Sequence, residues 1–198
     1  MAGTGLKTHG ITEATLQNLM FSAGAYYKNL KVPESDGAWT GTPLGATSGG
    51  GGLTVEPEYI TAELDGATVT VKGATQKVGE VGTMKINLTE FTEGLVADAL
   101  HLVEDKTSKV TGFKKYKTKA LIDDSDYLEN IAFVGKLTDG RQVIVIMENA
   151  ICLSAFELDT KDKEQAVYEL EMTCTADITQ EDLNHLPIHI YFPQVGMV

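Results

Sequence analysis

Two histidines near the C-terminal end are the first candidates for chemistry. His185 and His189 stand four residues apart, a spacing that on a helix presents two imidazoles to one metal ion. Pro187 lies between them and disfavours a helix. In an extended segment the two rings would still share one face. We therefore predict ordinary histidines of an edge strand, and neither a metal site nor a cofactor.

A run of four glycines is the second candidate, because glycine-rich loops cradle phosphates with backbone N–H groups. The run lies in "GTPLGATSGGGGLTVEPEY", residues 41–59, and comprises Gly49, Gly50, Gly51 and Gly52. No Gly-Lys-Ser/Thr follows it, and a strand-like segment begins at Leu53 where a phosphate loop would need a helix. The pattern instead predicts one long, flexible loop over residues 31–52.

The only tryptophan, Trp39, falls inside this predicted loop. An exposed indole is unfavourable, so we expect Trp39 to dock on the core of its own domain or on a neighbouring subunit. We also expect the loop to be disordered in the free chain and to become ordered on assembly. Trp39 and the four glycines are then candidates for contacts between subunits.

Motifs for catalysis are missing from the sequence. Neither G-x-S-x-G nor H-E-x-x-H occurs, and the acidic pair Asp123-Asp124 is typical of a turn. Cys152 and Cys174 lie in apolar, strand-like runs without C-x-x-C spacing, which predicts buried thiols. A disulfide between neighbouring strands is the alternative, and the sequence leaves open how close the two cysteines lie. We predict that the protein is not an enzyme.

The charge balance limits the partners. The chain of 198 residues has 16 basic and 28 acidic side chains, a net charge of −12, whereas proteins that grip nucleic acid are normally basic. No apolar run approaches the ~20 residues of a transmembrane helix, and residues 1–10 lack a signal-peptide pattern. We expect one soluble domain over residues 1–198 that has no membrane partner.

Basic and acidic residues separate in the middle of the chain. Six lysines fall within fourteen positions: Lys106, Lys109, Lys114, Lys115, Lys117 and Lys119. Phe113 and Tyr116 lie among them, a pattern that is also found in nucleic-acid strips. We favour an exposed edge kept soluble by lysine, or a contact with the acidic stretch at residues 123–129 of another copy. The candidate contact residues are Lys114, Lys115, Lys117, Asp123 and Asp124.

Alternation of apolar and polar residues predicts strands in most of the chain. The segments "TMKINLT" (83–89) and "AVYELEMTCTADI" (166–178) alternate most regularly, and the second has an apolar face and a polar face. The polar face carries Glu169, Glu171, Thr173, Thr175 and Asp177. Residues 137–143 indicate a hairpin that turns at Asp139-Gly140. Residues 141–158 indicate two strands separated by a break at Glu148-Asn149.

One segment has helical periodicity instead. Residues 92–105 place Leu95, Ala99 and Leu102 on one side, with Thr92 as the N-cap. Residues 16–30 fit a helix or a strand, and Gly24 and the tyrosines after it favour a strand with a bend. Residues 1–15 are expected to form an N-terminal arm. Residues 178–198 form a C-terminal extension that is either a short edge strand or a tail docked on a partner.

The order of several short motifs resembles a known family. "TPLGATSGGGGLTVEPEYITAELDGATVTVKG" (42–73) is similar to the opening half of the major tail (tail tube) proteins of long-tailed bacteriophages. The later "MKINLTEFT", "ENAI" and "ELEMTCTA" also resemble segments of that family. The likeness extends over residues 16–177.

The resemblance implies a mainly β, tail-tube-type β-sandwich or barrel with one flanking α-helix, a long Gly/Pro-rich loop and extended termini. It also implies that six copies form a ring whose inner sheets join into one continuous barrel, and that the rings stack into a tube. Such a tube encloses the tape-measure protein, meets tail terminator and distal tail proteins at its ends, and later conducts viral DNA. The implied location is the virion tail, after assembly in the cytoplasm of the host bacterium.

The predicted polar strand face would then line the lumen, with Glu169, Glu171, Thr173 and Thr175 as the candidate residues. An acidic wall repels phosphates at short range, so DNA would pass without specific binding. The runner-up is a monomeric β-sandwich that serves as a virion-surface or adhesion module, and a small enzyme is the third possibility. Which face lines the lumen, the number of subunits in a ring and the presence of a contractile sheath are left open.

Overall fold

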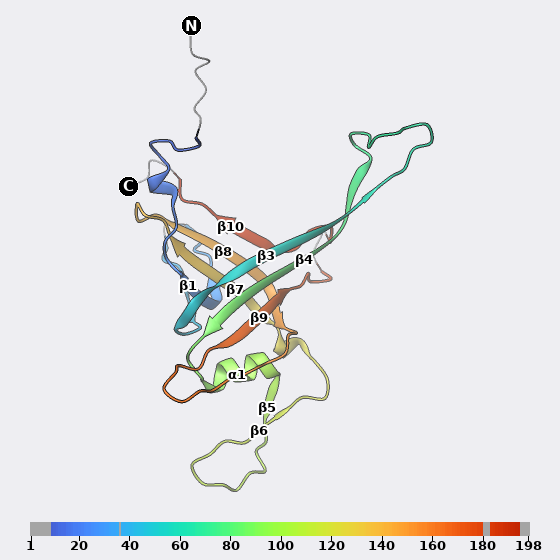
Figure 1. Ribbon diagram of the computed structural model, residues 1–198. Helices are drawn as coiled ribbons and strands as arrows, with labels where there is room; N and C mark the ends of the chain where they lie inside the picture. The colour runs from blue at the N-terminus through green and yellow to red at the C-terminus, as the bar shows by residue number, and fades with distance from the viewer. Residues whose placement is uncertain (1–8, 36, 180–182, 195–198) are drawn as a thin grey trace.

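The computed structural model describes residues 9–35, 37–179 and 183–194. It is mainly β, with one α-helix beside an antiparallel sheet, as the sequence predicts (Figure 1). The main sheet has the strand order β2-β1-β7-β8-β9-β4-β3, and β10 also pairs with β8. The strands are β1 (Ala25–Lys31), β2 (Thr40–Pro43), β3 (Thr47–Thr61), β4 (Thr75–Leu88), β7 (Leu128–Lys136), β8 (Gln142–Cys152), β9 (Tyr168–Cys174) and β10 (Ile188–Tyr191).

Strand β8 divides the sheet into the two halves that enclose the core. Along one edge it pairs with β7, from Lys136↔Gln142 to Leu128↔Ala150. Along the other edge it pairs first with β10, up to Ile188↔Met147, and then with β9 from Ala150↔Cys174. The predicted break at Glu148-Asn149 lies where this partner changes, and Asn149 has φ 49° there. The prediction of two separate strands was wrong, because β8 continues through this point.

The core lies between the halves and consists of the apolar faces of the alternating strands. Strand β4 contributes Met84, Ile86 and Leu88, and β9 contributes every second residue from Tyr168 to Cys174. Ile131 of β7 and Met147 of β8 close the core from the other half and are fully buried. Each such side chain contributes roughly 1.5–3 kcal/mol on burial. The alternation that predicted β4 and β9 is therefore confirmed.

A second, smaller cluster covers the outer face of β7 and β8. It contains Leu30, Ala132, Ile144 and Ile146, and Trp39 packs against it. The indole also meets the ring of Tyr191 edge-on, with 5.2 Å between the centroids. Of the two docking sites expected for Trp39, the structure shows the one on its own domain.

Of the predicted long loop over residues 31–52, only the connections between β1 and β2 and between β2 and β3 are loops. Residues 40–43 form β2, and β3 begins at Thr47, so the glycine run lies inside a strand. Between the pairs Thr47↔Leu88 and Gly51↔Ile86, β3 has two residues more than β4, which makes a bulge. The expectation that residues 31–52 become ordered only on assembly stays a prediction, although the glycine run belongs to β3 within a single chain.

The glycines of the bulge have distinct roles. Gly49 and Gly50 have φ values of 80° and 72°, a region that side chains disfavour. Gly51 lies so close to Lys85 and Tyr26 that a Cβ would overlap the Lys85 carbonyl oxygen and come within 2.5 Å of the Tyr26 hydroxyl. Gly52 has open space around it. Two glycines therefore form the bulge, and one permits close packing.

Helix α1 (Glu93–Leu100) packs Leu95 and Ala99 into the main core. Thr92 is its N-cap, as predicted, and accepts a hydrogen bond from the Leu95 N–H at 3.5 Å. The predicted extent of 92–105 was too long, because His101 is left-handed with φ 50° and ends the helix. The short strand β5 (Leu102–Glu104) follows and pairs with β6 (Tyr116–Thr118), and residues 105–115 join them.

The remaining predictions concern the hairpin at residues 137–143, the segment at residues 16–30 and the C-terminal extension. The hairpin at residues 137–143 is confirmed by a Leu137 N–H bond to the Arg141 carbonyl at 2.8 Å. The strand predicted within residues 16–30 begins after Gly24, which has φ 71°, and a single 3₁₀ turn, η1 (Leu16–Asn18), precedes it. Within the C-terminal extension, β10 is the predicted edge strand.

The predicted N-terminal arm and the rest of the C-terminal extension are only partly described. Residues 9–14 of the arm are exposed. Residues 1–8 of the arm, and residues 180–182 and 195–198 of the extension, lie outside the described residues. Within the described part, no helix is long and apolar enough to cross a membrane.

Candidate assembly surfaces

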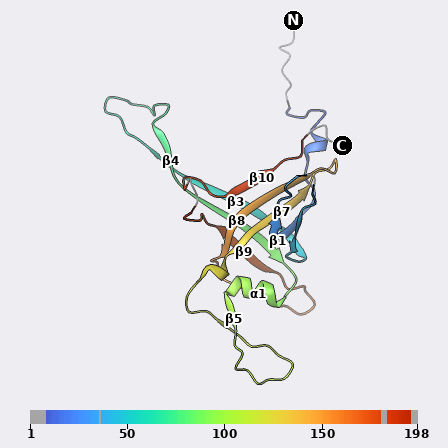
Figure 2. The same ribbon diagram turned by 180° about the vertical axis from the view of Figure 1, so that it is seen from behind.

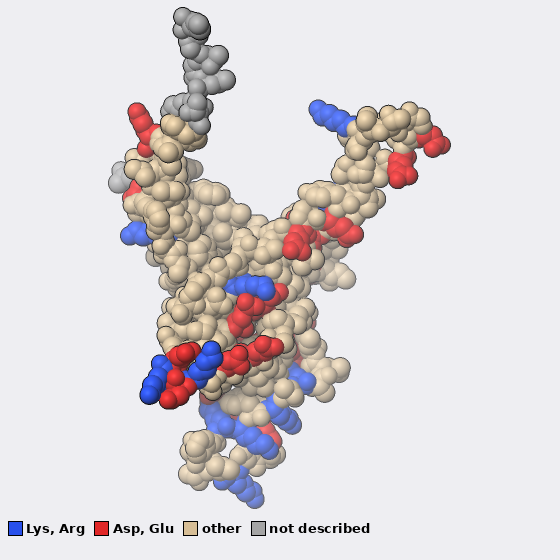
Figure 3. Space-filling view, viewed as in Figure 1, with Lys and Arg blue, Asp and Glu red and all other residues tan. Residues whose placement is uncertain are grey.

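The polar face of strands β4 and β9 carries the predicted lumen residues. Lys85 of β4 lies between two carboxylates of β9, at 3.3 Å from Glu169 and 2.8 Å from Glu171. The hydrogen bonds to Glu171 and Glu169 raise the pKa of Lys85. Thr83 and Thr173 extend this face through their pairing. Figure 3 views the molecule from the side on which β3 and β4 lie in front.

The predicted lumen residues differ in how exposed they are and in whether they are bonded within their own chain. The side chain of Glu169 is 50% exposed and that of Glu171 is 24% exposed. Thr175 lies beyond the end of β9 and donates a hydrogen bond to the Asn149 carbonyl at 2.7 Å, so it is engaged within its own chain. Lys85 reduces the negative charge of the face. The sequence alone does not place Lys85 directly opposite Glu171 and diagonal to Glu169, because this arrangement depends on the register of β4 and β9.

A long hairpin arm projects from the domain. We define the arm as residues 53–81; it is distinct from the N-terminal arm of residues 1–15. It comprises the outer parts of β3 and β4 and the turn at residues 62–74 that joins them. In Figures 1 and 2 it extends away from the sheet at the end opposite α1, β5 and β6. Its exposed apolar side chains are Leu53, Val55, Tyr59, Ile60, Leu64, Val69, Val71, Val78 and Val81.

The arm is poorly stabilised by its own chain. Two-stranded hairpins are marginally stable in water, and a sizeable apolar surface usually marks a contact site. Among the described residues, the side-chain contacts of the hairpin include a 2.9 Å bond between the hydroxyls of Thr61 and Thr75, an ion pair of 2.7 Å between Lys77 and Glu80, and a 3.3 Å bond from the Leu186 N–H to Glu80. The arm is also acidic, with five carboxylates and two lysines.

The lysine cluster lies at the other end of the molecule, on the loop between β5 and β6, on β6 and directly after β6. Of the two interpretations of these lysines, the exposed two-stranded edge agrees with the pairing of β5 with β6. The contact with the acidic stretch of another copy stays a prediction, although several of the lysines are paired within the chain. Lys114 lies 2.9 Å from Glu93, and Lys115 lies 3.0 Å from Asp105. Lys117 is exposed, as is Asp124 of the acidic stretch. Sequence spacing alone predicts neither Glu93 as the partner of Lys114 nor Asp105 as the partner of Lys115.

Lys119 links the basic and acidic stretches inside one chain. Its Nζ lies 2.9 Å from Asp126 and 3.1 Å from Asp123. The turn η2 (Asp124–Asp126) is closed by a capping box, in which Asp123 accepts from the Ser125 N–H and Asp126 accepts from the Asp123 N–H. The Ser125 hydroxyl and N–H together with Lys119 lower the pKa of Asp123 to about 2.

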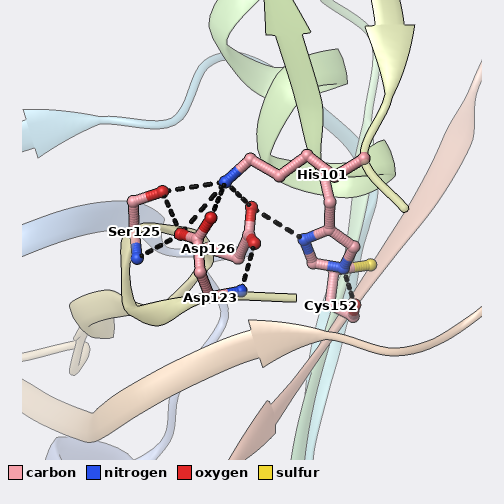
Figure 4. A network of polar contacts seen from close by, with 6 residues as sticks. His101, Asp123, Ser125, Asp126 and Cys152 are labelled. Carbon is pink, nitrogen blue, oxygen red and sulfur yellow. Dashed lines mark hydrogen bonds and ion pairs between the residues drawn. The ribbon is translucent and has the colours of Figure 1, made fainter. Parts of the chain in front are cut away.

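The same network fixes the end of helix α1. The Nε2 of His101 donates to the Cys152 carbonyl oxygen on β8 at 2.6 Å, and its Nδ1 faces the Asp126 carboxylate at 3.6 Å (Figure 4). Asp126 is thus enclosed by His101, Lys119 and a backbone N–H, with a side chain only 5% exposed. The network attaches the segment that follows β6 to the helix and the sheet, and sequence reasoning missed it because its members come from distant segments.

Asp126 gives the network a pH dependence. Burial alone would raise the pKa of Asp126, but the Asp123 N–H and Lys119 outweigh burial and lower it. Because the folded pKa lies below the unfolded value, ionised Asp126 stabilises the fold above about pH 4, and this contribution is lost as the pH falls through the folded pKa. We expect Asp126→Asn to lower the free energy of unfolding at pH 7, and the difference from wild type to shrink towards pH 3.

Urea unfolding at a series of pH values measures this effect. Asp124→Asn is the matched control, because Asp124 is the exposed neighbour in the same turn. A difference between wild type and Asp126→Asn that stays constant from pH 7 to pH 3 would contradict the assignment.

The other candidates for chemistry are structural. Cys152 and Cys174 are free and buried, which excludes the disulfide alternative. They lie on neighbouring strands but are offset, since Cys152 pairs with Met172 and Cys174 with Ala150. Burial raises the pKa of Cys174 to about 12, so it is a thiol at neutral pH.

The histidines form no ligand set with their neighbours. His189 lies on β10, 3.3 Å from Glu148, as expected for an edge-strand histidine. No group of three residues able to hold a metal ion occurs among residues 9–35, 37–179 and 183–194. Comparison with known proteins adds no further assignment, since no protein-family model matches the chain and no curated protein matches it either.

Proposed function

We propose that this protein is the repeating subunit of a hollow tube, assembled as stacked hexameric rings and used as the tail tube of a long-tailed bacteriophage. The observation that carries the proposal is the arm, residues 53–81, which extends its exposed apolar side chains away from the core. A monomer would leave this surface in water, whereas an assembly would bury it. This favours a self-assembling subunit over a monomeric surface or adhesion module.

The open edges of the sheet also support assembly. Strands β2 and β3 end the strand order and β10 ends a branch, so all three have an edge that is unpaired within the described residues. Such edges invite pairing with another chain, and closure into a ring removes them. The glycine bulge lies in β3, so it shapes one of the edges that a neighbouring subunit would meet.

The polar face of β4 and β9 suits a lumen that conducts DNA. Glu169 and Glu171 outnumber Lys85 on this face, so each subunit contributes excess negative charge. Repeated around a ring, this charge would repel phosphates within the Debye length of roughly 8–10 Å and let DNA pass without specific contacts. The proposed partners are further copies of the chain, a tape-measure protein, and tail terminator and distal tail proteins. The proposed location is the virion tail, after assembly in the bacterial cytoplasm.

Charge reversal on this face tests the proposed lumen. In Glu169→Lys/Glu171→Lys, two lysines would replace the two carboxylates, so that this face would carry three lysines together with Lys85. We expect tubes of this variant, assembled with short duplex DNA, to retain DNA that a nuclease cannot digest, while wild-type tubes retain none. Retention should weaken steeply as salt rises, because it depends on phosphate contacts.

The matched control is Glu157→Lys/Glu164→Lys, which reverses two exposed glutamates on the segment between β8 and β9. Any DNA bound by the control should be digested. Full digestion of the DNA bound by Glu169→Lys/Glu171→Lys would place these residues outside the tube and contradict the assignment.

A further inference from the structure

A groove opens between helix α1 and the loop that joins β5 to β6. Its volume is about 520 Å³, and its apolar lining includes Phe91, Val96, Leu102 and Phe113. Phe91 is 60% exposed and Phe113 is 78% exposed, although Phe91 also lies 6.1 Å from the ring of Tyr168 in the core. The groove therefore offers aromatic surface that the described chain leaves in contact with water.

The loop and strand beside the groove are rich in lysine. Lys114 lines the groove beside Glu93, its ion-pair partner at 2.9 Å, and the same loop and β6 carry four further lysines. Although Lys114 and Lys115 have acidic partners, Lys106, Lys109 and Lys117 are exposed. A ligand with apolar side chains flanked by carboxylates would match both features of the groove.

The turn of the arm has this composition. Among residues 62–74, the apolar Leu64, Val69 and Val71 are exposed, and Glu63 and Asp65 supply two carboxylates. The seven residues from Val55 to Thr61 carry the turn about 23 Å from the domain at the usual rise of a strand. Figures 1 and 2 show the arm and the β5–β6 loop at opposite ends of the molecule, and Figure 3 shows basic side chains gathered at the loop end.

We propose that the turn of the arm of one subunit docks in the α1/β5–β6 groove of a second copy in the next layer. This inference rests on the proposed tube and names the contact that joins its layers. Leu64 and Val69 enter the groove beside Phe91 and Phe113, and Glu63 and Asp65 meet the exposed lysines of the β5–β6 loop and β6. The turn of the arm and the groove lie at opposite ends of the folded molecule, so the contact is head-to-tail and repeats along the stack.

A cysteine pair tests this contact. Val69→Cys/Phe113→Cys places one thiol on the arm and one at the groove, and the native cysteines are buried. Under mild oxidation we expect assembled protein to give a ladder of covalent multimers, because each chain is linked to the next. Each single variant should give no product larger than a dimer. Val69→Cys/Leu121→Cys is the matched control, since Leu121 is 82% exposed and does not line the groove.

A charge exchange provides an independent measurement. Glu63→Lys/Asp65→Lys, or Lys109→Glu/Lys117→Glu, should raise the concentration needed for assembly about tenfold or more, which corresponds to about 1.4 kcal/mol. Combining all four substitutions should restore assembly towards the wild-type concentration.

The outcomes separate this inference from the proposed function. If wild-type protein forms tubes but Val69→Cys/Phe113→Cys gives no ladder and charge reversal has no effect, the groove contact is wrong while the tube stands. If wild-type protein forms no tubes or rings under any condition, the proposed function itself fails.

Discussion

Replacing residues 59–78 by Asn-Gly is expected to abolish assembly and to leave a folded monomer. The pair Glu58↔Gly79 would then be closed by a two-residue turn that favours the twist of a hairpin. The replaced segment contains no residue of the main core cluster, so the melting temperature should change by only a few degrees. Tube formation should be lost because the exposed apolar surface of the arm is removed.

Thermal unfolding and electron microscopy of the same samples measure both parts of this expectation. The control shortens the exposed turn at residues 161–164, which lies outside the arm and outside the core. Tubes that form at the wild-type concentration without the arm would show that the arm is dispensable. Loss of tubes in the control as well would show that assembly is sensitive to any shortened loop, which would also contradict the assigned role.

Gly51→Ala is expected to produce the largest loss of stability of any single substitution considered. The added methyl group would overlap the Lys85 carbonyl and press on the Tyr26 hydroxyl, so β3 must move or the ring of Tyr26 must shift. Tyr26 is 3% exposed, and its ring lies 5.3 Å from that of Phe133, so little free space can absorb the change. Overpacking of this kind typically costs about 1–3 kcal/mol.

The adjacent glycine is a matched control for this substitution. No atom lies within 4 Å of a Cβ built on Gly52, and its φ is not positive, so Gly52→Ala should change the free energy of unfolding by no more than about 0.5 kcal/mol. Urea unfolding followed by the fluorescence of Trp39 measures both variants. Equal stability of the two variants would refute the packing assigned to Gly51.

The strands that could be predicted are those with one buried face. In β4 and β9 the alternation of apolar and polar residues follows burial directly. Both the strands and their polar, solvent-facing side are confirmed. The hairpin at Asp139-Gly140 was also predictable, because its turn chemistry is local. The arm was not recognised, because the strand-like pattern that begins at Leu53 does not show that β3 and β4 continue beyond the end of their neighbour β9.

The features that could not be predicted depend on contacts between distant segments. Glycine has no side chain to show periodicity, so the run at residues 49–52 indicated a loop, although Lys85 and Tyr26 determine its role. Helical periodicity continues past Leu100, but the left-handed His101 ends the helix where its ring bonds to β8 and faces η2. In the same way, the partners of Lys114 and Lys115 become known only once β5 pairs with β6.

The central claim is that this chain builds a tube whose lumen is lined by the polar face of β4 and β9. Electron microscopy of the purified protein at high concentration tests it most directly. We predict hollow tubes of stacked six-membered rings, and a reconstruction in which Glu169 and Glu171 face the lumen. A monodisperse monomer under all conditions, or tubes that carry these glutamates on the outer surface or in an interface, would contradict the claim.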